Sequence, residues 1–223
     1  MRHLLLYTLL FFLISLQPAG AQFSAAPGQA NHVDIRLSAG QDKIVPGAEF
    51  DLLILQEIAA GWHTYWKNPG DSGAPSQFEI ITPPGFSVRE VEWPAPIRIP
   101  YMSLMNYGYE DSALFKASIS APETIQSENI EITVKASWLV CHEICIPEKT
   151  VQSLTLPVGE NAKVTNQNLL DDIAQTHAAL LDIPASYQEA DGRFFLTLPV
   201  TPAFKDNPPQ AFFPVQEGII QNA

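Results

Sequence analysis

The sequence predicts an all-β fold, an immunoglobulin-like antiparallel β-sandwich, followed by one helix and the start of a second β module. Three observations support this prediction. Short apolar segments recur along the chain and are separated by turns rich in proline and glycine. Aromatic residues make up 10% of the 223 residues and prolines number 19, which is typical of turn-rich β structure rather than of disorder. No segment with the apolar spacing of a helix interrupts these strands.

The first 21 residues have the order of a secretory signal peptide. A basic start at residues 1–3 precedes a 13-residue apolar run at 4–16, and small residues at 19–21 supply a cleavage site. A membrane helix needs about 20 apolar residues, so an uncleaved N-terminal anchor is the weaker alternative. We therefore expect export to the periplasm, with residues 22–32 forming a loose leader.

The immunoglobulin-like domain is expected at residues 33–160. Apolar and polar residues alternate in its first strand and most clearly in residues 130–140, as in half-buried strands. About eight strands are predicted, at residues 33–38, 50–58, 62–66, 78–81, 87–93, 115–119, 130–140 and 151–158. Residues 67–73 are expected to form a loop, and prolines bound an irregular stretch at 94–100. Residues 102–110, rich in Tyr, Met, Asn and Gly, are assigned no strand.

Residues 161–184 predict a helical linker. Leucine and isoleucine recur at helical spacing between residues 165 and 182, Asn166 is a candidate N-cap, and Pro184 ends the helix. His177 lies on or beside this apolar stripe, so we expect it to be packed rather than to bind a ligand. Residues 185–223 then predict an incomplete second β module, with strands at 193–200 and 212–214.

The charge of the chain excludes two classes of function. Twelve basic and 24 acidic residues give a net charge of −12, which opposes binding to a nucleic-acid backbone. The same charge excludes a polybasic helix on a membrane surface. The sequence also contains no glycine-rich phosphate loop, no G-x-S-x-G motif and no metal-binding helix with two histidines.

The two cysteines, Cys141 and Cys145, are the candidate chemical centre. In an exported protein such a pair is expected to form a disulfide. An extended strand would separate them by about 13 Å, so a bridge requires a turn at residues 142–144. Strand alternation points Cys141 away from the inner core, so we expect the pair at an exposed strand end or hairpin tip.

Three interpretations of this pair remain open from the residues alone. A loop of about five residues stabilises a fold by only about 2 kcal/mol, and short exposed disulfides exchange readily, which favours a redox role. Cys141, His142 and Cys145 could instead bind Cu(I) or Zn(II), with Glu143 nearby. The third interpretation is an inert disulfide in an interaction domain. His142 would stabilise a thiolate and Glu143 would oppose it.

Two long segments of the sequence carry distinctive motifs: residues 61–75, GWHTYWKNPGDSGAP, and residues 136–148, ASWLVCHEICIPE. Both resemble the N-terminal periplasmic domain of DsbD/ScsB-type thiol:disulfide interchange proteins. Trp93-Pro94 and residues 107–110 fit the same pattern, and the resemblance runs from about residue 33 to 223. The three residues between the cysteines are closer to the ScsB-like branch than to DsbD. The aromatic and turn residues of 61–75 themselves predict architecture rather than chemistry, and His63 among them is expected to be structural.

The resemblance implies a protein-disulfide reductase domain whose only redox group is its disulfide. Such a domain relays electrons from a membrane-embedded thiol reductase to soluble periplasmic thioredoxin-like or disulfide proteins, and the family is linked to copper tolerance. Cys141 and Cys145 would be the dithiol, one attacking a partner disulfide and the other resolving the intermediate. A cap loop over the pair is also implied. Its candidates are Met105, Asn106, Tyr107 and Tyr109, with ordinary sheet-edge packing as the alternative for the tyrosines.

The resemblance also sets an expectation about the length of the protein. Proteins of this kind usually continue into a polytopic membrane domain and a thioredoxin-like domain, and neither follows here. We therefore expect either a fragment of a longer protein, which would place the domain at a membrane, or a dependence on a separate membrane partner.

Overall fold

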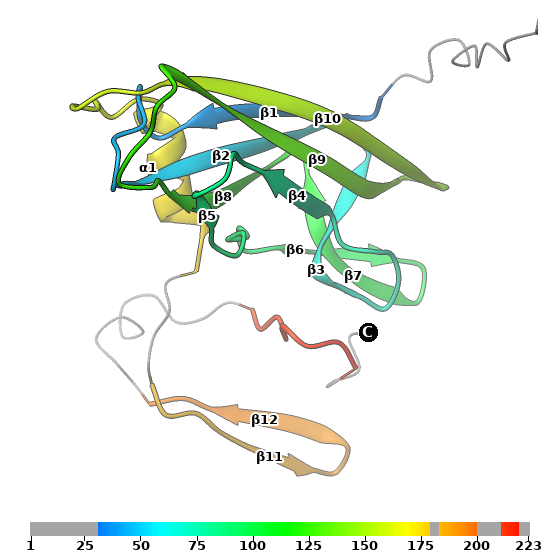
Figure 1. Ribbon diagram of the computed structural model, residues 1–223. Helices are drawn as coiled ribbons and strands as arrows, with labels where there is room; N and C mark the ends of the chain where they lie inside the picture. The colour runs from blue at the N-terminus through cyan, green and yellow to red at the C-terminus, as the bar shows by residue number, and fades with distance from the viewer. Residues whose placement is uncertain (1–30, 179–182, 200–210, 219–223) are drawn as a thin grey trace, which may run out of the picture. The chain divides into compact units, whose positions relative to one another are not determined.

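The computed structural model describes residues 31–178, 183–199 and 211–218. The predicted signal peptide and most of the predicted leader lie outside these residues. Two antiparallel sheets face each other, which confirms the expected sandwich (Figure 1). The first sheet has the order β1-β2-β8-β5, with the bounds β1 Val33–Ala39, β2 Glu49–Ile58, β8 Ser112–Ser120 and β5 Ser87–Val88.

The second sheet carries the cysteine pair. Its order is β10-β9-β3-β7-β6, and β4 also pairs with β9. The bounds are β3 His63–Gly70, β4 Gln77–Ile81, β6 Ile97–Tyr101, β7 Leu104–Glu110, β9 Asn129–Cys141 and β10 Cys145–Pro157. Strand β10 lies at one edge of this sheet and β6 at the other, so only the strands between them have neighbours on both sides.

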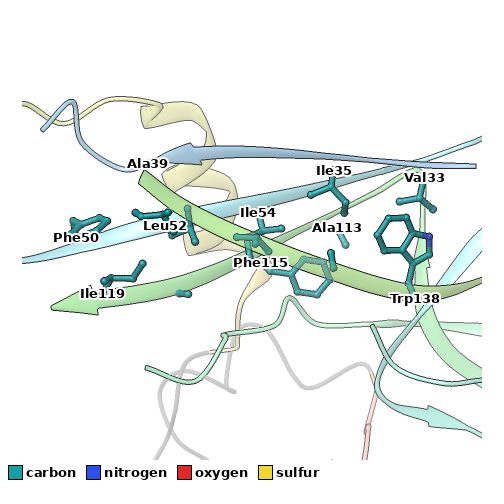
Figure 2. Packing of buried hydrophobic residues seen from close by; sticks show 14 of the residues in the cluster. Val33, Ile35, Ala39, Phe50, Leu52, Ile54, Ala113, Phe115, Ile119 and Trp138 are labelled. Atoms are coloured by element: carbon teal, nitrogen blue, oxygen red, sulfur yellow. The ribbon is translucent and has the colours of Figure 1, made fainter. Parts of the chain in front are cut away.

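The core lies between the two sheets. Alternate residues of β9 are buried, as the polar–apolar pattern of this segment predicts. Figure 2 shows Phe115 of β8 and Trp138 of β9 packed among side chains of β1 and β2. Removing an aromatic side chain from such a core costs about 3–5 kcal/mol, so these residues hold the two sheets together.

The helix α1 (Gln167–Thr176) packs on the first sheet rather than serving only as a linker. Its Ile173 is buried against Leu53 and Leu114. The helix is shorter than predicted, because Asn166 has a left-handed φ of 53° and His177 is extended. The Asn166 side chain does not cap the helix and instead donates to the carbonyl of Ala39. Residues 179–182 of the predicted helix lie outside the described residues.

Three segments that we predicted as loops or left unassigned are strands. Strand β3 continues to Gly70, with an irregular register between Tyr65 and Gly70. There the Gly70 backbone N–H donates to the side-chain oxygen of Asn68, which bridges Pro69. The structure also forms β6, which tolerates Pro100 because it is an edge strand, and its partner β7. The predicted strand at 87–93 is conversely reduced to Ser87–Val88.

The described part of residues 185–223 forms one hairpin and one irregular segment. Strands β11 (Ser186–Ala190) and β12 (Arg193–Thr197) meet at a turn where Asp191 and Gly192 both have positive φ. The strand predicted at 212–214 is absent from the described segment. Phe213 instead meets aromatic rings of β3 and β7 edge to face, and the Asn68 amide donates to the Pro214 carbonyl at 2.7 Å. Among the described residues, α1 is too short and polar to cross a bilayer.

Candidate redox site

The two cysteines face each other across the end of the β9–β10 hairpin. Cys141 is the last residue of β9, Cys145 is the first of β10, and they are directly opposite in the antiparallel register. A disulfide joins them, with their Cα atoms 4.1 Å apart. A hydrogen bond from the His142 amide to the Ile144 carbonyl closes the turn. The predicted turn and hairpin tip are therefore confirmed.

The two sulfur-bearing residues differ sharply in exposure. Cys141 is only 2% exposed, whereas Cys145 is exposed. Our expectation of an exposed pair is thus correct for Cys145 and wrong for Cys141. The reason is that β3 pairs with β9 at this one position, where His63 lies opposite Cys141 and closes that side of the sheet. Cys145 begins an edge strand and has no such neighbour in the sheet order.

Tyr65 covers the buried side of the disulfide. Its hydroxyl donates to Cys141 Sγ at 3.0 Å and lies 3.8 Å from Cys145 Sγ. The ring lies so close to Gly73 that an added Cβ would overlap ring carbon Cε1, and Gly73 has a φ of +100°. Glycine at this turn therefore permits the Tyr65 ring to lie where it reaches both sulfurs.

His63 stands behind Tyr65 on the same face of β3. Its Nε2 lies 3.3 Å from the Tyr65 hydroxyl, and the two rings meet edge to face. Burial lowers the pKa of His63 below its ordinary value of 6.5, and the nearby charge of His142 lowers this pKa further. Burial raises the pKa of Tyr65, and so does the proximity of Tyr101. At neutral pH the site therefore holds a neutral imidazole beside a protonated phenol.

A second group of side chains holds the other side of the hairpin end. The Glu148 carboxylate accepts hydrogen bonds from the backbone N–H and Nδ1 of His32, at 3.0 and 2.7 Å, and from Trp138 Nε1 at 3.2 Å. The Trp62 ring lies 3.8 Å from the His32 ring and 5.8 Å from the His142 ring. These contacts tie the start of β1 to the disulfide turn and to β10.

The tyrosine candidates for a cap loop lie in the core. Tyr107 and Tyr109 are buried with Trp66 in the main hydrophobic cluster, on the face of the sheet opposite Tyr65. The Tyr109 hydroxyl donates to the carbonyl of Pro94 at 2.9 Å. The expectation that these tyrosines cover the cysteine pair is therefore corrected: they pack in the sheet, and Tyr65 provides the cover.

The other two cap candidates hold a neighbouring loop. Asn106 is buried, and its side-chain oxygen accepts from the amide and hydroxyl of Ser72 at 3.1 and 2.9 Å. The Met105 amide donates to the Asp71 carboxylate at 2.7 Å, and the Met105 side chain packs on the core. Both residues thus position the β3–β4 loop that contains Gly73, and their effect on the disulfide is indirect.

The β6–β7 hairpin contributes a residue that the sequence did not single out. Tyr101 is close enough to Tyr65 to raise its pKa, and Met102 at the hairpin tip is 91% exposed with a φ of 53°. In Figure 1 the ends of the β6–β7 and β9–β10 hairpins lie on the same side of the view. The remaining predicted neighbours of the pair, His142 and Glu143, are both exposed at the turn.

The metal-binding interpretation has no preformed site in the described part of the chain. Residues 31–178, 183–199 and 211–218 contain no group of three or more His, Cys, Asp or Glu side chains arranged to hold a metal ion. The two sulfurs proposed as ligands, those of Cys141 and Cys145, are bonded to each other.

The contacts of His63 and Tyr65 beside the disulfide are not among the sequence predictions. Residues 61–75 predict architecture, because their aromatic and turn residues suit a strand and a loop. The missed signal is the alternation within His63, Thr64 and Tyr65, which places the first and third side chains on the face away from the core. Two polar aromatic side chains on that face need partners: Tyr65 finds them in the cysteine sulfurs, and His63 finds its partner in the Tyr65 hydroxyl.

Comparison with known proteins identifies the fold and the family. The N-terminal domain family of the thiol:disulfide interchange protein DsbD matches residues 33–157. The N-terminal periplasmic domain of ScsB from Proteus mirabilis is similar in structure, with a TM-score of 0.55 and 22% identity, covering 78% of this chain. The match spans 66% of that ScsB chain, just under two thirds of its length.

More distant matches add no further identification. The reduced N-terminal domain of DsbD from Neisseria meningitidis has a TM-score of 0.37 and 13% identity, covering 60% of this chain and 90% of that one. The search of curated proteins finds no significant match. Since the family match covers more than half of the residues and includes both cysteines, this chain belongs to the DsbD N-terminal domain family of thiol:disulfide interchange proteins.

Proposed function

We propose that this chain relays electrons in the periplasm, from a membrane-embedded thiol reductase to the disulfides of soluble thioredoxin-like or other partners. The observation that carries the proposal is the asymmetric disulfide, in which an exposed Cys145 is bonded to a buried Cys141 at a hairpin tip. Family membership supports thiol–disulfide chemistry in general. The direction of transfer and the class of partner belong to the proposal.

The chain is first reduced by its electron donor. A donor thiolate attacks the exposed Cys145 Sγ, the Cys141–Cys145 bond breaks, and Cys141 leaves as a thiolate that takes a proton. The second donor thiol then attacks the donor sulfur of this mixed disulfide and releases Cys145. The donor ends as a disulfide and the chain as a dithiol, so two electrons and two protons have moved.

The reduced chain then passes these electrons on. The Cys145 thiolate attacks one sulfur of the partner disulfide, and the other partner sulfur leaves as a thiolate and is protonated. Cys141 next attacks Cys145 Sγ and releases the second partner thiol, which restores the Cys141–Cys145 disulfide. Cys145 is the attacking residue in this scheme because it is the exposed one.

The surroundings of Cys145 support contact with a protein partner. Ile144, which directly precedes Cys145, is 66% exposed. Exposed apolar side chains beside a reactive group commonly mark a protein-binding surface. The predicted signal peptide at residues 1–21 supports export, and the electron donor is either a further domain of a longer protein or a separate membrane protein.

The reduction potential of the disulfide tests the proposal. The oxidised chain is equilibrated with glutathione redox buffers, and the free thiols are then counted after alkylation. A potential between about −180 and −280 mV lies in the range of exchange proteins and supports the relay. A potential far below about −300 mV, or thiols that react only after unfolding, would show a structural disulfide and reject the proposed function.

A further inference from the structure

We infer that His63 is a positioning residue for this exchange, which receives the Cys141 proton through the Tyr65 hydroxyl when Cys141 becomes the resolving thiolate. The inference rests on the proposed function and assigns a role to two residues outside the cysteine pair. Two adjoining contacts carry the inference: the Tyr65 hydroxyl oxygen lies within hydrogen-bonding distance of Cys141 Sγ on one side and of His63 Nε2 on the other.

The resolving step presents a chemical difficulty at Cys141. Only a thiolate can attack the mixed disulfide, and a thiol in buried surroundings ionises reluctantly. Cys141 is almost fully buried, so water has little access to its proton, whereas Cys145 can release its proton to solvent. A proton acceptor inside the protein would therefore help Cys141 and is not needed by Cys145.

The geometry supplies a route for that proton. In the reduced state the Cys141 S–H donates to the Tyr65 oxygen, and the Tyr65 O–H donates to the unprotonated Nε2 of His63. The thiol proton moves to Tyr65 as the Tyr65 proton moves to His63, which leaves a thiolate, a neutral phenol and an imidazolium. The Tyr65 hydroxyl then donates to the sulfur, as it does in the structure at 3.0 Å.

Electrons and protons balance in the step that follows. The Cys141 thiolate attacks Cys145 Sγ, the bond between Cys145 and the partner breaks, and the partner sulfur leaves as a thiolate. That thiolate takes a proton from solvent, and the His63 imidazolium returns its proton to solvent. The chain ends as a disulfide and the partner as a dithiol.

The surroundings keep His63 in the unprotonated form, which is the form that can accept a proton. The imidazole is 7% exposed, and burial and His142 both lower its pKa, so it is neutral at physiological pH. The groups that face His63 are Tyr65 on its own strand, His142 at the turn, and its two opposite residues in the sheet, which are Cys141 of β9 and Glu110 of β7. Glu110 is exposed to solvent and its charge is therefore screened.

A single-turnover reaction separates the two cysteines. The chain is reduced, freed of reductant and mixed with one equivalent of dithiobis(nitrobenzoate), a small aromatic disulfide that releases a coloured thiolate. Attack by Cys145 releases the first thiolate, and ring closure by Cys141 releases the second. Stopped-flow absorbance between about pH 5 and 9 gives the rate of each phase.

We expect the rate of the wild-type second phase to be independent of pH above the pKa of His63. Below that pKa the rate should decrease, because an imidazolium accepts no proton. His63→Gln, which keeps a polar side chain without its basicity, should slow the second phase by roughly tenfold or more at neutral pH. Its residual rate should rise continuously with pH, because hydroxide then removes the proton. The first phase should stay close to that of the wild type.

Two further variants sharpen the test. Tyr65→Phe breaks the same route while keeping the ring, and it should slow the second phase as His63→Gln does. His177→Gln is the matched control, because His177 is a second partly buried histidine with a lowered pKa that packs elsewhere, against Pro94. This control should leave both phases and the pH profile unchanged.

The outcomes distinguish the inference from the function on which it rests. Unchanged second phases in His63→Gln and Tyr65→Phe would overturn the inference and leave the exchange function intact. A wild-type second phase that rises with pH throughout, without levelling, would overturn it without any variant. A folded, reduced chain that releases no coloured thiolate would instead reject the proposed exchange function.

Discussion

The two ends of the disulfide belong to different environments, although only three residues separate them. Cys141 ends β9, a strand inside the second sheet, where β3 and the Tyr65 side chain cover it. Cys145 begins β10, the edge strand of that sheet, and is exposed. The same covalent bond therefore joins a buried cysteine to an exposed one.

This difference shows that sheet order, rather than local sequence, sets the exposure of the two cysteines. Edge strands leave one side open, which natural proteins usually protect against unwanted pairing. In the proposed exchange, the open side is the one from which a partner would reach the disulfide, and the covered side holds the thiol that would resolve the intermediate.

Removing either cysteine should abolish turnover, but the two variants should fail differently. Cys141→Ser retains the exposed thiol, so Cys145 should form a stable mixed disulfide with oxidised glutathione. Cys145→Ser leaves only the buried thiol, which should form this adduct far more slowly. Mass spectrometry of the intact chain measures the adduct over time. Equal rates of adduct formation in the two variants would contradict the assigned roles.

Displacing the Tyr65 ring should make the two cysteine thiols more alike in their reactivity. Gly73→Ala places a methyl group within the Tyr65 ring at a backbone φ of +100°, so we expect a loss of about 1–3 kcal/mol of stability. The Tyr65 ring must move, and the Cys141 thiol should then react faster with an alkylating agent in a reduced Cys145→Ser background. Urea unfolding and timed alkylation measure the two effects.

Gly192→Ala is the matched control for this experiment. Gly192 also has a positive φ, of +68°, but an added Cβ there meets no atom within 4 Å. This variant should lose only about 1 kcal/mol of stability, because alanine disfavours a positive φ, and the reactivity of Cys141 should stay unchanged. Faster alkylation of Cys141 in both glycine variants would show that general loosening, rather than the Tyr65 cover, controls access.

The sequence predicted the frame of the fold because its strands carry a strong period-two pattern. Residues 130–140 are the clearest example, and the structure confirms β9 there. Residues 104–110 escaped prediction because β7 buries successive residues on both faces, which removes the alternation. The helix was predicted too long, since its apolar spacing continues past the point where His177 turns to an extended conformation.

Only the position of the cysteine pair in the site was predictable, because the geometry of a disulfide constrains it. Two cysteines four residues apart require a turn, and this constraint placed the pair at a hairpin tip. The contrast between Cys141 and Cys145 depends on the pairing of β3 with β9, a contact between residues far apart in sequence. Tyr65 likewise reaches the sulfurs only through that pairing, so strand patterns alone could not identify the cover.

A substitution on the exposed side should affect recognition rather than stability. Ile144→Ser should change the free energy of unfolding by no more than about 0.5 kcal/mol, because Ile144 is exposed. We expect it to slow exchange with oxidised thioredoxin by about fivefold, equivalent to about 1 kcal/mol of lost contact, and to leave exchange with glutathione unchanged.

Val151→Ser is the control for Ile144→Ser, since Val151 is 62% exposed on the same edge strand, beyond the disulfide turn. It should leave both exchange rates at the wild-type value. Slower exchange with thioredoxin in both variants would indicate a general effect of edge hydrophobicity and would remove Ile144 from the docking surface.

The smallest expected effect is a dependence of stability on pH at the covered side. The folded-state pKa of His63 is lowered from 6.5, mainly by burial, so the unfolded chain binds more protons just below pH 6.5. The contribution of His63 to the free energy of unfolding is therefore fully present above about pH 6.5. It decreases as the pH drops from about 6.5 to the folded-state pKa and is constant below that pKa. The slope from one such group is at most about 1.4 kcal/mol per pH unit.

His177 also has a lowered pKa through burial, so the two histidines should add to one acid-dependent loss. Urea unfolding of the oxidised chain between about pH 5 and 8 should show a smaller slope in His63→Gln and in His177→Gln than in the wild type. Only the first of these should also abolish any acid-induced exposure of the disulfide to reductant, because only His63 contacts the Tyr65 cover. If His177→Gln removed that exposure equally, acid would loosen the whole sandwich, and the covered sulfur would owe its protection to global stability rather than to its own neighbours.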